Sequence, residues 1–421
     1  MVMAVVGLNW GDEGKGRMID YFAGDVDCVV RYQGGNNAGH TVKNEYGKFA
    51  FHNIPSGICY KNVVNIIAAG SVINPQSFIE EVEELKSKGL DTSNIFVSDR
   101  AIVILPQHIL RDELEEVRLV NKKYGSTKSG IAPVYGDKFL KKAIQVGELL
   151  DIEYLKEHLK DVLEHNDLII EKIYGKDKTD FDKVFNWLKE YGEKMRPYIK
   201  DVAPIIFKMQ KENKRIMVEA QLGALRDITH GIYPYTTSSS TLAGYACASV
   251  PIKPSELKDI VGITKAYSTC VGEGPFVTED FSEWATEVRI KANEFGATTG
   301  RPRRIGHFDI IATKYGCELQ GATQVTITCL DVLSGYDELK ICVGYEVNGE
   351  TIKDFPMIAK LNKAKPIYQC VGGWMEDISM VRNFEDLPKN AQEYVNTIER
   401  LLEVQVKYIS VGPNREELIV R

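Results

Sequence analysis

The sequence predicts an α/β protein with a large central, mostly parallel β-sheet flanked by helices. Two observations support this fold class. Apolar, β-branched runs recur along the whole chain and alternate with amphipathic helical patterns, which is typical of parallel sheets covered by helices. In addition, the first run, residues 2–6, leads through a glycine-rich loop into an amphipathic segment, as in a P-loop-like strand–loop–helix unit.

Each element has its own local signal. Strands are expected at residues 3–8, 28–33, 64–70, 95–99, 215–220, 324–331, 340–347 and 406–412, where apolar side chains run together. Asn74 and Pro75 provide a cap and a first-turn proline for a helix that stops at Gly89, and Pro388 precedes a second long helix over residues 391–405. Residues 147–213 are polar and helix-rich, so we expect an insertion there, within a single domain of residues 1–421.

The composition is that of a globular protein and argues against several functions. The net charge is 52 − 59 = −7, which speaks against a nucleic-acid-binding face. There is no run of 18 apolar residues and no basic-then-apolar leader, so we expect neither a membrane span nor secretion, and a cytoplasmic location. The eight cysteines are scattered without a Cys-x-x-Cys pair, which indicates reduced thiols rather than a disulfide framework or a zinc site.

The N-terminal loop combines a phosphate-binding pattern with carboxylates. Backbone N–H groups of residues 11–16 and the side chain of Lys15 are suited to phosphate, but the first glycine of the Walker pattern and its final Ser or Thr are missing. Asp12 and Glu13 lie inside the loop, where a carboxylate is repelled by phosphate unless it binds Mg²⁺ or takes a proton. An isolated acid at this place can also simply cap the helix.

Three further stretches carry polar side chains next to glycine or at a strand end. His40 ends a Gly/Asn-rich loop over residues 31–41, a position suited to a general acid or base. Residues 293–304 hold three arginines after a Thr-Thr-Gly turn, which indicates either an anion pocket or a solvated charge run. Asp331 ends an apolar strand, where its carboxylate can accept from guanine N1–H and N2–H₂ or cap the following turn.

These stretches belong to a longer series of short motifs. They are residues 10–16, 31–35, 37–41, 54–57, 230–231, 233–235, 237–239, 265–269, 272–276, 293–301, Asp331 and 412–413. Taken in this order, they resemble the adenylosuccinate synthetase family over nearly the whole chain.

The resemblance implies a reaction. The family joins IMP and L-aspartate with GTP and Mg²⁺ to give adenylosuccinate, GDP and phosphate, through a 6-phosphoryl-IMP intermediate. It implies catalytic roles for Asp12, His40 and Lys15, and magnesium ligation by Asp12 and the carbonyl of Gly39. It also implies a single α/β domain that works as a homodimer, with Lys141 placed to reach the partner's IMP phosphate.

The same resemblance assigns three binding sets. For GTP they are Gly11, Glu13, Gly14, Gly16, Gly39, His40, Thr41, Asp331, Ser410 and Gly412. For IMP they are Asp12, Asn37, Thr127, Lys141, Gln221, Thr237 and Arg301. For aspartate they are Thr298, Thr299, Arg301 and Arg303.

The chain departs from the family pattern around the purine. The glutamine expected near purine O6 is displaced by one residue to Gln221, with Leu222 in its place, and a one-residue slip on a strand reverses the side chain's direction. An arginine of the family is Ser129, the cross-dimer arginine is Lys141, and a lysine two before Asp331 is Cys329. These changes lie around the purine and its phosphate, whereas Asp12, His40 and the aspartate loop match the family. The main prediction is still IMP with GTP. The alternatives are a paralogue acting on another 6-oxopurine nucleotide of the GMP or dGMP type, and a non-catalytic nucleotide-binding relative.

Overall fold

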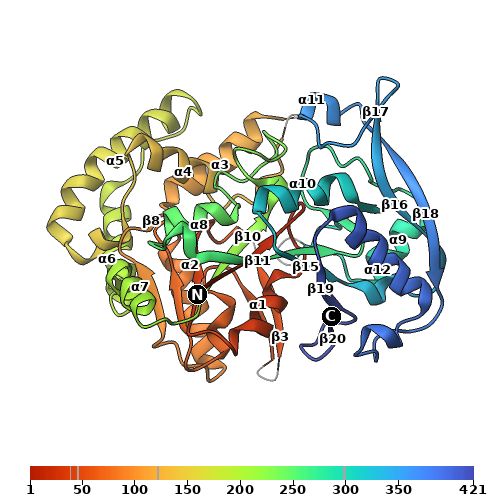
Figure 1. Cartoon of the computed structure of the whole chain (residues 1–421). Coiled ribbons are helices and arrows are strands. Elements are labelled where there is room, and N and C mark those ends of the chain that lie inside the picture. Colours follow the sequence, from red (N-terminus) through yellow and green to blue (C-terminus); the bar gives the residue numbers. More distant parts are fainter. Residues whose placement is uncertain (38, 45–46, 121–122, 297–299) are drawn as a thin grey trace.

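The computed structural model describes residues 1–37, 39–44, 47–120, 123–296 and 300–421. A ten-stranded sheet crosses the molecule (Figure 1). Its strands, in spatial order, are β20 (Leu418–Val420), β19 (Val406–Ser410), β15 (Gln324–Thr328), β11 (Leu257–Lys265), β1 (Val2–Gly7), β10 (Ile216–Gly223), β2 (Cys28–Arg31), β5 (Val64–Ile67), β7 (Ile95–Ser98) and β9 (Ile199–Lys200). Every neighbouring pair is parallel except β19 and β20, so the predicted fold class is confirmed.

Helices cover both faces of this sheet. Because side chains alternate along a strand, Val5 of β1 faces Met18 of α1, whereas Ala4 belongs to the opposite face with Ala246 of α8 and Ile206 of α7. The helices are α1 (Lys15–Ala23), α2 (Pro75–Ser87), α3 (Pro106–Arg118), α4 (Ile131–Leu140), α5 (Ile152–Lys172), α6 (Phe181–Met195), α7 (Val202–Lys211), α8 (Ala243–Ser249), α9 (Glu283–Lys291), α10 (Ile310–Gln320), α11 (Ile358–Leu361) and α12 (Lys389–Leu402).

Smaller sheets flank the main one. They are the hairpin of β3 (His40–Asn44) with β4 (Gly47–Phe51), the pair β6 (Val72–Ile73) with β8 (Ile102–Val103), the pair β12 (Ser268–Cys270) with β13 (Arg304–Gly306), and the group of β14 (Phe308–Asp309), β16 (Tyr336–Val347), β17 (Glu350–Ile352) and β18 (Lys365–Trp374). The hairpin of β3 and β4 contacts α1, which places His40 beside the N-terminal loop.

The two helices with strong local signals are present with modest shifts of their ends. The side chain of Asn74 accepts from the backbone N–H of Ser77, as expected for the cap of α2. α12 begins at Lys389 and ends at Leu402, before the expected end at residue 405, because the chain turns there into β19. Residues 147–213 are mainly α5, α6 and α7, but they also give β9 to the edge of the main sheet. No helix among the described residues is long and apolar enough to cross a membrane.

Candidate active site

Many of the sequence-predicted residues lie in loops at one edge of the main sheet. The loops that follow β1, β2, β10, β11, β15 and β19 all leave the carboxyl ends of parallel strands. In open α/β sheets this edge is where ligands bind.

The loop after β1 has an unusual backbone. Gly11, Asp12 and Gly14 have φ angles of 105°, 58° and 94°, so three of its residues are left-handed. An added Cβ on Gly14 would lie 3.3 Å from the side chain of Thr328, because β15 packs closely against the loop. α1 begins directly afterwards at Lys15, and its N-terminal N–H groups and dipole favour an anion.

The carboxylate of Glu13 occupies this loop. Its Oε1 accepts from the backbone N–H groups of Gly11 at 2.8 Å and Asn9 at 3.2 Å. Its Oε2 lies 2.6 Å from Nζ of Lys15, and both side chains are only 2% exposed. The donors expected to hold phosphate therefore hold a carboxylate of the protein's own.

Asp12 points elsewhere. Its side chain is 32% exposed, and its Oδ2 lies 3.0 Å from Nε of Arg303, which follows the predicted aspartate loop. The same arginine contacts the buried Glu294, which also accepts from Lys265 and, at 2.6 Å, from the hydroxyl of Tyr267. Burial would raise the pKa of Glu294, but Lys265 and Arg303 outweigh it and hold that pKa below its usual range. Arg303 is thus held between two carboxylates, one buried and one at the surface of the site.

His40 is the first residue of β3 and is paired with a carboxylate. Its Nδ1 contacts Oε1 of the fully buried Glu219. Glu219 also accepts from the backbone N–H of Ser56 at 2.9 Å and from its hydroxyl at 3.0 Å. Burial lowers the pKa of His40, and the neighbouring Glu219 opposes that effect. The pairing fixes the orientation of the imidazole and leaves Nε2 as the nitrogen that can serve a ligand.

Close packing joins this histidine to the N-terminal loop. An added Cβ on Gly16 would lie 3.0 Å from both Cβ of His40 and the carbonyl oxygen of Thr41. A side chain at this position would force its neighbours apart, so the glycine allows α1 and β3 to pack closely at the site.

Gln221 and Leu222 occupy different environments. The amide of Gln221 is buried, donates to the carbonyl of Gly35 at 2.8 Å and accepts from its N–H at 3.1 Å. Leu222 has a left-handed φ of 64°, and its side chain would touch an added Cβ on Gly11 at 3.4 Å. The leucine, rather than the amide, therefore borders the N-terminal loop.

The residues predicted for the IMP phosphate and ribose come from separate elements. The hydroxyl of Thr237 is buried and has no hydrogen-bond partner within the described parts of the chain. Asn37 accepts from the backbone N–H of Gly35 at 3.4 Å, and Thr127 is exposed in the segment between α3 and α4. Lys141 is exposed just after α4, with a left-handed φ of 61°.

The residues predicted for guanine lie after β15 and β19. Burial raises the pKa of Asp331, while the charge of Arg17 opposes that effect. Ser410 donates from Oγ to the carbonyl of Gly412 at 2.9 Å. Cys329 begins the short turn before Asp331 with a left-handed φ of 60°, and burial raises its pKa to about 11. The thiol is therefore neutral and adds no charge to this part of the site.

Two of the predicted aspartate-binding residues, Thr298 and Thr299, lie outside the described residues. Arg301 is exposed just after them, and its carbonyl accepts from the N–H of Gly296 at 2.8 Å. Arg303 is placed as described above.

A model of the adenylosuccinate synthetase family matches residues 4–419. The chain belongs to the adenylosuccinate synthetase family. Among its relatives, adenylosuccinate synthetase of Caldanaerobacter subterraneus subsp. tengcongensis is 44% identical, covering 100% of this chain and 99% of its own. That of Clostridioides difficile is also 44% identical, covering 100% and 98%.

Solved structures agree with the family assignment. The structure of fully ligated adenylosuccinate synthetase from Plasmodium falciparum covers 100% of this chain and 99% of its own, with 34% identity and a TM-score of 0.94. The cyanophage S-2L succinoaminodeoxyadenylate synthetase bound to dGMP and dATP covers 100% and 95%, with 16% identity and a TM-score of 0.61. The second likeness shows the fold alone.

Several partners of the predicted residues were not identified from the sequence as site residues. Glu219 and Glu294 are buried acids that fix His40 and Arg303. Glu219 had a visible signal, because it is a single charge inside an otherwise apolar strand. Glu294 had none beyond its place in the arginine-rich stretch.

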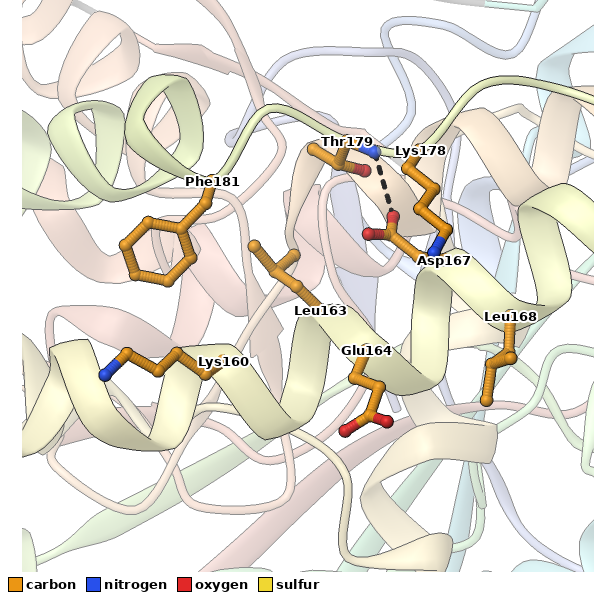
Figure 2. A pocket seen from close by; sticks show the side chains of 8 residues that line it. All are labelled: Lys160, Leu163, Glu164, Asp167, Leu168, Lys178, Thr179 and Phe181. Atoms are coloured by element: carbon orange, nitrogen blue, oxygen red, sulfur yellow. Dashed lines mark hydrogen bonds between the residues drawn. The ribbon is translucent and has the colours of Figure 1, made fainter.

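One hollow in the described part of the chain is lined by none of these residues. It has a volume of about 340 Å³ and lies between α5 and the segment leading to α6 (Figure 2). Asp167 accepts there from the backbone N–H of Thr179, with Lys160 and Lys178 at the rim and Leu163 on α5. It contains none of the predicted substrate groups.

Proposed function

We propose that this member of the family joins IMP and L-aspartate to adenylosuccinate, with GTP converted to GDP and phosphate. One observation supports this most directly. Asp12, the predicted base for the purine, lies 3.0 Å from Arg303, the predicted aspartate-binding residue. The atoms that would act on IMP and those that would hold aspartate therefore meet at one place.

In the proposed first step Asp12 takes the N1 proton of IMP, which makes purine O6 a nucleophile toward the γ-phosphate of GTP. O6 forms a bond to phosphorus and GDP leaves. His40, in the protonated form that the Glu219 carboxylate would stabilise, donates from Nε2 to the phosphoryl group, while its Nδ1 contact with Glu219 keeps the ring oriented. Most of the rate enhancement comes from positioning and from neutralising phosphoryl charge.

In the second step the aspartate amine attacks C6 and forms a C–N bond. The C6–O6 bond breaks with its electron pair going to O6, which leaves as part of phosphate, and the amine nitrogen loses a proton. His40 acts as the acid on the O6 side. Arg303 and Arg301 would hold the aspartate carboxylates, which requires Arg303 to exchange its contact with Asp12 for the substrate. Because Asp12 takes the purine proton in the first step, this exchange has to occur when aspartate binds, before that step.

Magnesium fits the donors that remain at this place. Asp12 and the carbonyl of Gly39 are both oxygen ligands, and Mg²⁺ is usually held by one or two protein oxygens together with waters and substrate phosphates. Among the described residues no group of three or more His, Cys, Asp or Glu side chains could hold a metal ion by itself. Bound there, the ion would neutralise charge on the transferring phosphoryl group.

One observation favours the alternative substrate, a nucleotide of the GMP or dGMP type. Leu222 puts an apolar side chain beside Gly11, where the family pattern has an amide. A GMP- or dGMP-type substrate is nevertheless the weaker proposal, because Asp12 is retained and the likeness to the dGMP-bound phage enzyme is lower than that to the Plasmodium enzyme. A purely binding role needs neither Asp12 nor His40.

One experiment separates these proposals. The protein is given aspartate, Mg²⁺ and GTP with IMP, GMP or dGMP in turn, and phosphate release and product absorbance are followed. We expect turnover with IMP. Turnover only with GMP or dGMP would transfer the proposal to the alternative, and no phosphate with any purine would reject the enzymatic function.

We also propose a homodimer in the cytoplasm, with residues 1–421 as a single domain and 147–213 as its insertion. The exposed side chains of Phe139 and Leu140 directly precede Lys141, which suits a surface that meets a second copy of the chain. Sedimentation with and without IMP tests the dimer, and a Lys141→Ala variant should raise the KM for IMP.

A further inference from the structure

The segment of residues 124–130 lies between α3 and α4 and carries Thr127. Three of its residues have positive φ: Gly125 at 77°, Lys128 at 56° and Gly130 at 74°. A short exposed segment with so many left-handed residues has many alternative conformations, so something outside it must select this one.

Two buried carboxylates on α3 accept hydrogen bonds from this segment. Asp112 and Glu116 are one helical turn apart, face the same side, and are each 6% exposed. Asp112 accepts from the hydroxyl of Ser126 at 2.6 Å and from the backbone N–H of Gly130 at 2.9 Å. Glu116 accepts from the backbone N–H of Tyr124 at 3.1 Å.

The contacts surround Thr127 without touching it. The hydroxyl of Ser126 donates to Asp112 and also accepts from the backbone N–H of Lys128 at 3.0 Å, which closes a turn around the threonine. Gly130, the other contact of Asp112, is the N-cap of α4. Thr127 itself is left exposed between these two anchored positions.

The carboxylates have no other evident purpose. Within the described residues neither Asp112 nor Glu116 forms an ion pair, and both accept from segment 124–130. Burying a carboxylate is costly unless it receives strong hydrogen bonds. Since the hydrogen bonds of Asp112 and Glu116 come from segment 124–130, we infer that holding this segment is their role.

We propose that Asp112 and Glu116 are positioning residues for nucleotide binding, which hold Thr127 in place for the phosphate of the purine nucleotide. The inference rests on the proposed function, because it takes the nucleotide monophosphate as the ligand of Thr127. It adds two residues on α3, neither of which contacts substrate.

The test compares Asp112→Asn with Glu113→Gln on the full-length protein. Glu113 is exposed on the same helix, so the control removes the same charge without touching the segment. For Asp112→Asn we expect the KM for IMP to rise about tenfold, which corresponds to ~1.4 kcal/mol, close to the lower end of the value of a hydrogen bond to a charged group. The KM values for GTP and aspartate, and kcat at saturation, should stay within about twofold, because a lost binding contact acts on KM alone.

Two single variants keep the idea testable if Asp112→Asn folds poorly, and a double-mutant cycle adds to the test if it folds well. Ser126→Ala removes only the hydroxyl, and Glu116→Gln only the contact to Tyr124; both should raise the KM for IMP. The effects of Ser126→Ala and Asp112→Asn should be less than additive, because they remove one shared contact. An unchanged KM for IMP in these variants, or a fall in kcat with all three KM values altered alike, would overturn the proposal. Failure of the proposed function itself is separate, because the unmutated protein would then release no phosphate with IMP.

Discussion

The pairing of Glu13 with Lys15 leads to a prediction that links stability to ligand binding. In the structure the carboxylate of Glu13 accepts hydrogen bonds from two backbone N–H groups of the loop and from Lys15. A phosphate that binds to the same N–H groups and lysine must therefore displace this carboxylate. Replacing Glu13 with Gln keeps an oxygen for the two N–H groups and leaves Lys15 without its counter-ion.

The magnitude follows from burial. Removing one partner of a buried ion pair destabilises by about 3–5 kcal/mol. Since the amide of Gln still accepts from Gly11 and Asn9, we expect about 3 kcal/mol, the lower end of that range. With GTP bound, phosphate oxygens would supply the counter-charge to Lys15, and the loss should nearly vanish. The difference between the losses of the free and the GTP-bound protein, about 3 kcal/mol, means that GTP should bind about a hundredfold more tightly to Glu13→Gln than to the unmutated protein, at ~1.4 kcal/mol per tenfold.

Urea unfolding with and without Mg²⁺ and GTP, in the absence of IMP, measures the stability terms, and equilibrium titration measures affinity. Glu84→Gln is the matched control. Glu84 also lies 2.6 Å from a lysine, Lys88, but both side chains are exposed, so its loss should cost roughly 0.2–1 kcal/mol regardless of GTP. An equal loss of stability in the free and GTP-bound states of Glu13→Gln would show that the carboxylate does not yield its place to phosphate.

The remaining predictions concern single residues of the site and of the core. Burial raises the pKa of Asp309 to about 6 in the folded chain. Since the folded protein then binds this proton more tightly than the unfolded chain, stability should fall by about 3 kcal/mol as the pH rises from about 4 to above 6. Asp309→Asn should flatten that profile in urea titrations, and an unchanged slope would count against it. Asp12→Asn should lower kcat by roughly 10³-fold in phosphate-release assays with GTP binding retained, the usual contribution of a general base; retained activity would remove Asp12 from its role. Cys329 lacks the apolar stem and the charge of the family's lysine, so we expect a weaker preference for GTP over ATP. Cys329→Lys should raise the GTP-over-ATP ratio of kcat/KM, and strict GTP dependence of the unmutated protein would refute this expectation.

The parallel core could be predicted from the sequence because its strands are buried on both faces and appear as continuous apolar runs. β11 was missed although it is central, since its first residues are charged and partly exposed. β18 was missed for another reason: it lies in a flanking antiparallel sheet with much of its length exposed, which leaves no clear apolar pattern.

The sequence predicted which residues form the site but did not predict which side chains contact one another. Glycine-rich loops identified Asp12, His40 and the arginine-rich stretch, because those residue types in flexible backbone suit phosphate chemistry. Which side chains meet depends on the folded sheet, so the contacts of Asp12 with Arg303 and of His40 with Glu219 could not be read from local sequence. The internal use of the Gln221 amide likewise follows from the register of β10.

The strand order also determines when the site can form during synthesis. In the chain β1 precedes both of its sheet neighbours, β10 and β11, which begin at Ile216 and Leu257. The two edges of β1 and the loop that follows it can therefore make their final contacts only after more than half of the chain has been synthesised. Contacts so distant in sequence make folding slow and leave early strands open to aggregation. A nascent chain that stops before Leu257 has the residues of the N-terminal loop and lacks one of the two strands that hold it in shape.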